Sequence, residues 1–562
     1  IGSRSGSSGN SSAWLPVAAA WRTVLGMLGA AVLAAAAAAA AATGTTSRVA
    51  LLDRARRRRR LKDADVSTSD ADAQMDAADG DAPQLEDLAS TTDLPDPGRK
   101  TWRQANETRP RRRPGRVMES DGSREVRSAD LPGRQRLFVK TMGCAHNSSD
   151  SEYMMGLLQD YGYSFVDDLE AADACLINSC TVKNPSQDSA LNLVQRAQKA
   201  GKSVVLAGCV PSADTALADG LKGVSMLSVA QLDRVVEVVE EATRGHVVKL
   251  LGKHRSLPSL ELPKVRRNSY IEIIPISGGC LGNCSYCKTK HARGKLSSYA
   301  EEAIVGRALQ AASEGVSEVW LASEDTGAYG LDIGTNIAAL LRRVADELPP
   351  GVMLKLGMTN PPYMLAHIEA VAEVLKRPNV FGFLHVPVQS GSDQVLRGMV
   401  REYTASDFRR LIDGLRASAP EVTIATDIIC GFPNEAEDDH KASMSLVEDY
   451  RFPILNISQF YPRPGTPAAR LKKLPGDVVK RRSTEMTKLF ESYTTYELLV
   501  GREERAWFSE TNARHGQTVG HTKFYAKVVV PRDDDLLGRS AIVRLRTATK
   551  WHVEADVIGE LR

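Results

Sequence analysis

The stretch that decides the fold runs from Cys280 to Cys287 and reads CLGNCSYC. Its three cysteines are separated by three and then two residues, so three thiolates can reach one metal centre. A structural zinc site takes four protein ligands, and three thiolates would leave it one short. An iron–sulfur cluster held by three cysteines keeps one iron open for a reacting molecule. The spacing therefore favours a reactive iron–sulfur cluster on Cys280, Cys284 and Cys287, with an incomplete zinc knuckle as the alternative.

With this spacing the chain resembles the radical S-adenosylmethionine (SAM) enzymes. The resemblance implies that the open iron binds the amino and carboxylate groups of SAM. It also implies that an electron from the cluster cleaves SAM to give a 5′-deoxyadenosyl radical. We expect Tyr286, beside the last ligand, to pack against the adenine of SAM. Eight cysteines in 562 residues are too sparse for a disulfide scaffold, which agrees with metal ligation in a reducing compartment.

Strands and helices alternate on the C-terminal side of the connector that precedes these cysteines. Apolar strands are predicted at 270–276, 318–323, 352–357, 380–387, 422–429 and 454–460, with helices between them, such as 300–313 and 406–418. Repeated units of this kind have right-handed crossovers and build a parallel sheet. Six units predict an incomplete (β/α)6 barrel, as radical SAM enzymes have. The cysteine loop follows the first strand, at the face where barrel active sites lie.

Turn motifs follow the other predicted strands at the same face. The resemblance assigns the turn SEDTG, after the second strand, to the methionine amino group of SAM, and its glycine allows close backbone approach. The turn PVQSGS follows the fourth strand. Because both turns come after strands, they are predicted to supply the SAM contacts Ser323, Glu324, Asp325, Thr326, Gly327, Gln389 and Ser390.

A smaller parallel α/β sheet is predicted upstream. Its strands are 137–141, 174–178 and 203–207, its helices 151–161 and 186–199, and an amphipathic helix at 227–241 closes it. Cys144, Cys180 and Cys209 each follow a strand, at the edge where such sheets bind ligands. They are therefore predicted to hold a second cluster with an open iron. Cys175 and Cys430 are interpreted as buried structural residues.

The first 136 residues lack this alternation. Residues 23–42 carry no charge, and their length matches the ~20 residues that cross a hydrocarbon core. Residues 1–50 are therefore either a membrane anchor or a plain Ala-rich extension. If they insert, the basic flank keeps the rest of the chain on the cytoplasmic side, for instance at the endoplasmic reticulum. Residues 63–97 contain acidic residues but no Lys or Arg, and residues 98–136 are Arg-rich. Both stretches lack apolar periodicity, so residues 51–136 are predicted to form a disordered linker.

The C-terminal segment is predicted to be a small β-barrel. Five short strands are expected at 505–509, 517–522, 525–530, 540–547 and 552–558. The segment resembles the TRAM domain, an RNA-binding module. Lys523, Phe524, Tyr525 and Lys527 combine aromatic and cationic side chains as RNA contacts do, with core packing as the alternative for the two aromatics.

The complete order of motifs resembles the methylthiotransferases. It implies an N-terminal methylthiotransferase domain (137–246), a connector (247–265), a radical SAM domain (266–495) and a TRAM domain (496–562). The motifs CKTKHARG, NSCTVKNP and SEDTGAYG resemble the eukaryotic and archaeal branch that acts on threonylcarbamoyladenosine in tRNA. The resemblance implies that the adenosine at position 37, directly 3′ of the anticodon, receives a methylthio group at carbon 2, which gives 2-methylthio-threonylcarbamoyladenosine.

Two [4Fe-4S] clusters and SAM are the cofactors that this resemblance implies, with tRNA and an electron donor as partners. We expect a monomer that works in the cytoplasm. A radical SAM methylthiotransferase acting on a ribosomal-protein side chain is the rival enzyme. A non-catalytic RNA-binding or membrane-tethered protein would need damaged ligand sets, whereas both cysteine triplets are intact.

Overall fold

The computed structural model describes residues 133–181, 184–214, 220–252, 257–559 and 561. The Ala-rich segment 1–50 and the predicted linker up to residue 132 lie outside these ranges, as do two residues of the NSCTVKNP motif. Across the described ranges, no helix has the length and apolar character needed to span a membrane.

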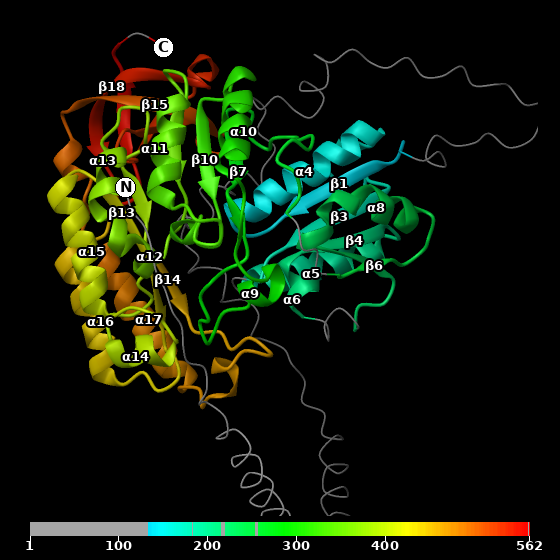
Figure 1. Cartoon of the computed structure of the whole chain (residues 1–562), viewed down its shortest axis with the longest axis horizontal. Coiled ribbons are helices and arrows are strands. Elements are labelled where there is room, and N and C mark those ends of the chain that lie inside the picture. The colour runs from blue at the N-terminus through cyan, green and yellow to red at the C-terminus, as the bar shows by residue number, and fades with distance from the viewer. Residues whose placement is uncertain (1–132, 182–183, 215–219, 253–256, 560, 562) are drawn as a thin grey trace, which may run out of the picture. The chain divides into compact units, whose positions relative to one another are not determined.

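A six-stranded parallel sheet forms the first folded unit, with the order β2-β1-β3-β4-β5-β6 (Figure 1). Its strands are β1 (Arg136–Thr141), β2 (Ser164–Val166), β3 (Ala174–Ser179), β4 (Ser203–Gly208), β5 (Val224–Ser228) and β6 (Lys249–Leu250). Its helices are α4 (Ala145–Tyr161), α5 (Asn184–Lys199), α6 (Cys209–Ala213) and α8 (Val235–Thr243). The predicted parallel sheet is confirmed, with three strands more than the sequence indicated.

The helix predicted at 227–241 is wrong at its start. Leu227 and Ser228 belong to β5, and the 3₁₀ turn Val229–Arg234 separates that strand from α8. Leu227 pairs with Ala207 of β4 and is fully buried. A short apolar run of this kind fits a buried strand as well as a helix, so periodicity alone could not separate the two.

Six parallel strands form the predicted partial barrel. They are β7 (Ile271–Pro275), β10 (Glu318–Ala322), β11 (Met353–Leu356), β12 (Phe383–His385), β13 (Thr423–Cys430) and β14 (Ile454–Gln459). They group as β11-β10-β7 and β12-β13-β14, and a parallel bridge between Leu354 and Val380 links the two groups. Strand β12 is shorter than predicted at both ends, and just before it the Gly382 N–H donates to the Lys523 carbonyl of the C-terminal barrel.

Helices fill the connections between these strands (Figure 1). They are α9 (Thr289–Arg293), α10 (Glu301–Ser313), α11 (Ile337–Glu347), α12 (Pro361–Met364), α13 (Ile368–Leu375), α14 (Asp393–Gly398), α15 (Ala405–Ser418), α16 (Glu437–Tyr450) and α17 (Gly476–Glu491). A two-stranded ribbon, β8 (Ser277–Gly278) with β9 (Ser297–Ser298), closes the base of the cysteine loop. The sequence therefore predicted both the number and the order of the barrel strands.

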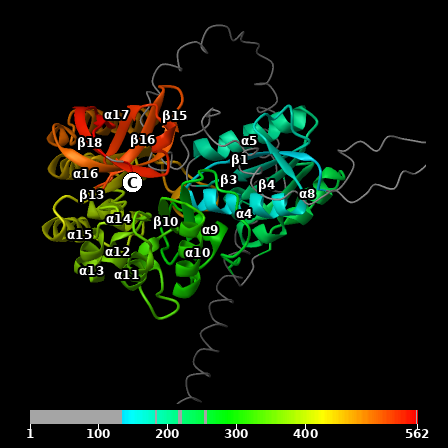
Figure 2. The ribbon, with the colours of Figure 1, turned by 90° about the horizontal axis from the view of Figure 1, so that it is seen from above.

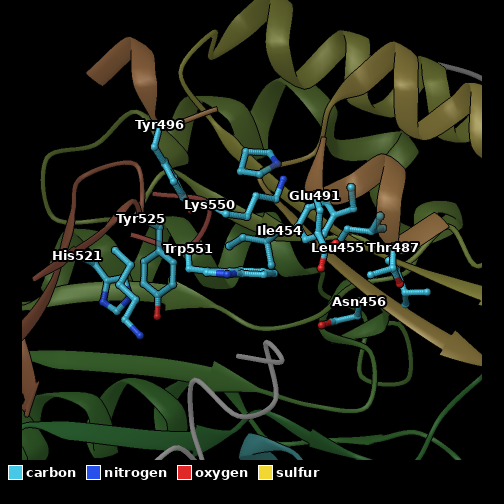
Figure 3. Close-up of a pocket in the computed structure, with 14 residues that line it drawn as sticks. Ile454, Leu455, Asn456, Thr487, Glu491, Tyr496, His521, Tyr525, Lys550 and Trp551 are labelled. Carbon is cyan, nitrogen blue, oxygen red and sulfur yellow. The ribbon is translucent and has the colours of Figure 1, made fainter. Parts of the chain in front are cut away.

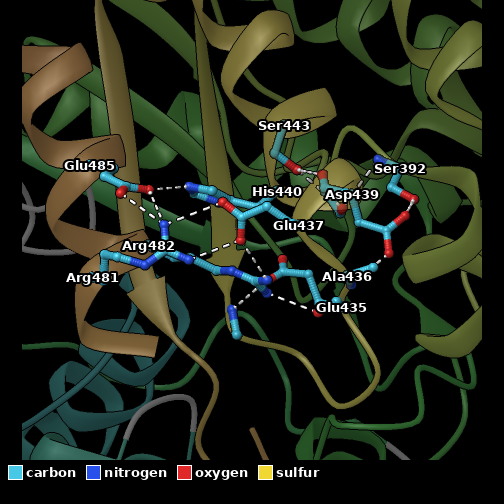
Figure 4. A network of polar contacts seen from close by, with 12 residues as sticks. Ser392, Glu435, Ala436, Glu437, Asp439, His440, Ser443, Arg481, Arg482 and Glu485 are labelled. Carbon is cyan, nitrogen blue, oxygen red and sulfur yellow. Dashed lines mark hydrogen bonds and ion pairs between the residues drawn. The ribbon is translucent and has the colours of Figure 1, made fainter. Parts of the chain in front are cut away.

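Figure 4 shows how α17 is held against α16 and the loop before it. Arg482 of α17 donates to the Glu435 carboxylate at 2.7 Å, and both side chains are almost completely buried. His440 of α16 lies 3.0 Å from Glu485, whose carboxylate also accepts from Arg481. These contacts fix the last helix before the chain enters the C-terminal module.

That module is a closed barrel of five strands with the order β15-β16-β17-β19-β18 (Figure 2). The strands are β15 (Glu503–Asn512), β16 (Gln517–Thr522), β17 (Lys527–Pro531), β18 (Arg539–Ala548) and β19 (Val553–Val557). The predicted small β-barrel is confirmed. Strand β17 begins two residues later than expected because Tyr525 adopts a positive φ of 63° in a tight turn, which breaks the extended backbone.

A buried charge cluster joins the first sheet domain to the barrel. Glu272 of β7 is fully buried and accepts from Lys264 at 2.9 Å and from Arg307 at 3.1 Å. Lys264 also pairs with Glu152 of α4 at 3.1 Å. Burial alone would raise the pKa of Glu272, but Lys264, Arg266 and Arg307 outweigh it and lower that pKa to about 2.

Glu272→Gln is expected to destabilise the protein by about 3–5 kcal/mol, because it removes the carboxylate that pairs with the buried Arg307 and shares Lys264 with Glu152. The folded-state pKa is depressed, so the carboxylate's contribution is complete above pH 4.5 and is lost as the pH falls towards about 2. Urea unfolding at several pH values checks this, and the gap between parent and variant should close below pH 4.5. Glu302→Gln, at an exposed ion pair, is the control. An equal loss from both substitutions would contradict the argument.

Candidate functional site

All six predicted cluster ligands line one cavity of about 300 Å³ at the carboxyl ends of the barrel strands. Its wall contains Cys144, Cys180 and Cys209 from the first sheet domain and Cys280, Cys284 and Cys287 from the barrel. All six are free thiols. The two triplets lie more than 70 residues apart in the chain, and the fold brings them to a shared space.

The first triplet is assembled by three neighbouring strands. Cys144, Cys180 and Cys209 follow β1, β3 and β4, which are adjacent in the sheet, so their loops meet at one edge. Glycines precede two of the cysteines and adopt positive φ values, +105° at Gly143 and +96° at Gly208. A Cβ at position 143 would stand 2.6 Å from Cys180 Sγ, which is closer than such atoms can lie. Only glycine at this position therefore lets Cys144 and Cys180 come close to each other.

The second triplet lies in the loop between β8 and α9. Cys284 Sγ accepts a hydrogen bond from Arg401 Nη1 at 3.0 Å, and Cys287 Sγ accepts from the Thr289 amide at 3.3 Å. Lys290 braces the loop by donating to the Leu281 carbonyl and the Asn283 side chain, each at 2.8 Å. Hydrogen bonds to sulfur are one way in which proteins adjust cluster potentials, so these donors fit a cluster-binding loop.

Three thiols and an adjoining cavity match an iron–sulfur cluster with an open iron better than a closed zinc shell. Within the described ranges, no three His, Cys, Asp or Glu side chains converge closely enough to hold a single metal ion. Burial raises the pKa of Cys144 to about 12 and that of Cys280 to about 12. A cluster takes cysteines as thiolates, so cluster binding at these residues would release their protons.

A buried ion network lies between the two triplets. Arg293, at the end of α9, donates to Asp150 of α4 at 2.5 Å and to the Asn147 side-chain oxygen at 2.7 Å. Its Nε lies 2.8 Å from Glu324, which in turn lies 3.0 Å from His146 Nδ1. The side chains of Arg293, Asp150, Glu324 and His146 are each at most 7% exposed. Asn147 also lies 3.5 Å from Cys209 Sγ, so the network reaches the first triplet.

The predicted SAM residues divide into two groups. Tyr286, Ser323, Glu324 and Gln389 line the cavity. The structure places the others behind its wall, where Thr326 Oγ1 donates to the Met358 carbonyl at 3.0 Å. The members of this second group are Asp325, Thr326, Gly327 and Ser390. SAM contact by any of these residues stays a prediction.

Asp325 supports the cavity wall from behind. Its carboxylate accepts from the Asn360 side chain at 2.7 Å and from the Gly327 amide at 3.2 Å. Burial raises the pKa of Asp325 to about 6, although the bonds from Asn360 oppose this rise. The Asn360 oxygen accepts from Arg401, which also donates to Cys284. The SEDTG turn and the second cysteine triplet are therefore linked through Asn360 and Arg401.

Sequence reasoning assigned no role to the lysine and arginine side chains that line this cavity, namely Arg293, Lys355, Arg401 and Arg463. Arg293 stands six residues after Cys287 in CKTKHARG, and its place beside the cysteines was the available signal. Lys355 interrupts the otherwise apolar strand β11 as MLKL, and a charge inside a buried strand could have marked it. Arg401 lies in an exposed-looking loop and offered no signal.

The residues predicted to contact RNA lie where the C-terminal barrel meets the partial barrel. Tyr525 is 1% exposed and packs on Phe381 and Phe383, and Lys523 Nζ donates to the Leu375 carbonyl at 2.6 Å. Phe524 and Lys527 are partly exposed. The alternative interpretation of Tyr525, core packing, is thus what the structure shows. RNA contact by this segment stays a prediction.

Two family models match the chain. Residues 136–227 match the uncharacterized protein family UPF0004, and residues 274–447 match the radical SAM superfamily. A threonylcarbamoyladenosine tRNA methylthiotransferase of Xenopus laevis is 48% identical, over 85% of this chain and 86% of that protein. The Homo sapiens protein of the same name is 46% identical, over 80% and 79% respectively.

Among solved structures, TsrM, a radical SAM methyltransferase of Kitasatospora setae with cobalamin and a [4Fe-4S] cluster bound, gives a TM-score of 0.44 at 15% identity. The match covers 59% of this chain and 76% of that one. At this level of similarity the match supports no statement about function.

Proposed function

The chain belongs to the threonylcarbamoyladenosine tRNA methylthiotransferases, and from this premise we propose that it methylthiolates carbon 2 of threonylcarbamoyladenosine at position 37 of tRNA. As a radical SAM enzyme of this family it uses a [4Fe-4S] cluster and SAM, and a tRNA is its substrate. The proposed product is 2-methylthio-threonylcarbamoyladenosine. The domain boundaries 137–246, 266–495 and 496–562, with the connector 247–265, are part of the same proposal.

One observation carries the proposal: two cysteine triplets from different domains line a single cavity. In our proposal Cys280, Cys284 and Cys287 hold the cluster that binds SAM. Cys144, Cys180 and Cys209 hold a second [4Fe-4S] cluster, which carries the sulfur to be transferred. A cavity shared by both sets lets one flipped adenosine face the two sites without leaving the enzyme.

Carbon 2 of adenine carries a C–H bond with no acidic proton, so general base catalysis cannot activate it. The bound cofactors would supply a 5′-deoxyadenosyl radical, which takes a hydrogen atom from such a bond. The chain's own residues bind and orient. Arg401 donates to Cys284 Sγ, and Arg293 ties helix α9, which follows Cys287, to helix α4.

Mass spectrometry of nucleosides from a deletion strain tests the proposal. We expect 2-methylthio-threonylcarbamoyladenosine to disappear from tRNA while threonylcarbamoyladenosine accumulates. Loss of a methylthio group from a ribosomal protein instead would favour the rival enzyme class.

After anaerobic reconstitution we expect about eight irons per chain, as two four-iron clusters require. Membrane attachment through residues 23–42 and an electron-donor protein remain sequence-based predictions.

A further inference from the structure

Lys355 is a buried cation in the wall of the cysteine-lined cavity that neither cluster uses. Lys355 is 7% exposed, and in the sheet register it is paired with Trp320 of the neighbouring strand β10. The ammonium lies 3.8 Å from the centre of the Trp320 ring, 4.2 Å from that of Tyr525 and 5.4 Å from that of Phe383. An aromatic cage therefore surrounds it on several sides.

Lys355 has fewer partners than its donors require. An ammonium carries three N–H groups, and among the described residues only Tyr525 Oη, at 2.6 Å, accepts from it. No described carboxylate forms an ion pair with it, since Glu318 and Glu510 act on it only from a greater distance. Burial lowers the pKa of Lys355 to about 8, although the carboxylates of Glu318 and Glu510 oppose this shift. Because neither carboxylate reaches ion-pair distance, the ammonium keeps N–H groups that the carboxylate of a ligand could accept from.

The position of Lys355 fits the far end of a substrate. The cysteines lie at the carboxyl ends of the strands, whereas Lys355 extends towards the C-terminal barrel, which packs at the opposite ends. There Asn268, just before β7, donates to the Ser509 carbonyl at 2.8 Å. Tyr525 accepts from Lys355 at this end, and its ring stacks on His521 with the ring centres 4.1 Å apart. Figure 3 shows Tyr525 and His521 side by side in the separate cavity of about 150 Å³ beyond it.

The group that distinguishes the proposed substrate is an anion. A threonylcarbamoyl substituent ends in a free carboxylate, and it is attached to N6 of adenine, away from carbon 2. With carbon 2 at the cysteine end, the substituent extends into another part of the cavity. We propose that Lys355 binds this carboxylate and makes the enzyme specific for adenosines that carry it. This inference rests on the proposed function and adds the residue that recognises the substituent.

Anticodon stem–loop RNAs test the inference with the reconstituted full-length chain. One RNA carries threonylcarbamoyladenosine at position 37, and the other carries the neutral carboxamide in place of its carboxylate. For the parent enzyme we expect kcat/KM to be about 10- to 100-fold lower on the carboxamide, since a charged hydrogen-bond partner is lost. Lys355→Met should lower kcat/KM on the RNA with the carboxylate by a similar factor, mostly by raising KM. The same variant should leave kcat/KM on the carboxamide RNA nearly unchanged.

Lys550→Met is the matched control, because the Lys550 ammonium also lies over an aromatic ring, 3.6 Å from the centre of Phe490, and donates to the Tyr493 carbonyl, but it does not line the cysteine-lined cavity. It should keep the full preference for the acid. Lys355→Gln repeats the test if the methionine variant does not fold. The inference would be overturned if the parent enzyme modified both RNAs equally. It would also be overturned if a Lys355 variant lost activity equally on the carboxylate RNA and on the carboxamide RNA. A parent enzyme inactive on the acid RNA would instead refute the proposed function.

Discussion

Cys209→Ala is expected to lower methylthio transfer at least about 10³-fold while SAM cleavage by the reduced enzyme stays within about twofold of the parent. Cys209 belongs to the triplet of the first sheet domain, and the hydrogen bonds from Arg401, Thr289 and Lys290 that hold the loop from Cys280 to Cys287 do not involve it. Removing one of three ligands should empty the proposed sulfur-carrying site but leave the SAM site loaded. Iron per chain should fall by about half. Anaerobic assays that quantify 5′-deoxyadenosine and the modified nucleoside separately measure the two effects.

Cys175→Ala is the matched control for this experiment. Cys175 is a buried cysteine of β3 in the same sheet, yet it does not line the cavity. This variant should keep both activities and the full iron content. If Cys209→Ala still transferred the methylthio group at the parent rate, the first triplet would not hold the sulfur donor. If it abolished SAM cleavage as well, the two triplets would not be separate sites.

Arg293→Met should be the most damaging single change outside the cysteines. It leaves Asp150 and Glu324 buried with their principal cation removed, at a cost of about 3–5 kcal/mol. The two triplets should then lose their fixed relation, because Arg293 joins the loop after Cys287 to the helix that starts at Cys144. We expect methylthio transfer to fall below detection and the melting temperature to drop, as measured by nucleoside mass spectrometry and calorimetry.

Arg343→Met is the control for Arg293→Met. It also removes an arginine that has several carboxylates around it, but at the surface of the protein. Arg343 pairs with Glu301, Glu302 and Glu347, but its side chain is 36% exposed, so water screens the pairs. Exposed pairs contribute little, and we expect near-parent activity and stability. Equal damage from Arg293→Met and Arg343→Met would show that the buried network has no special part in joining the triplets.

Local patterns determined which elements form and what chemistry they carry. Neighbouring residues alone are enough to interpret three patterns: the spacing in CLGNCSYC, the repeated βα units and the cysteines that follow strands. Element boundaries were less certain. Leu227 belongs to a strand because of its pairing with Ala207, and Tyr525 leaves β17 because of a turn held by the neighbouring domain. Such pairings involve residues far apart in the chain, so no local window could contain them.

The sequence by itself determined a six-stranded partial barrel and a five-stranded C-terminal barrel, and it singled out the six cysteines that we propose as cluster ligands. Tertiary structure alone decided that both triplets line one cavity and that Arg293 links them. It also decided that Lys355 lies in an aromatic cage completed by Tyr525, 170 residues further along the chain. The physical reason is burial: charges such as these are stable only where a distant segment supplies their partners, and that pairing exists only in the folded chain.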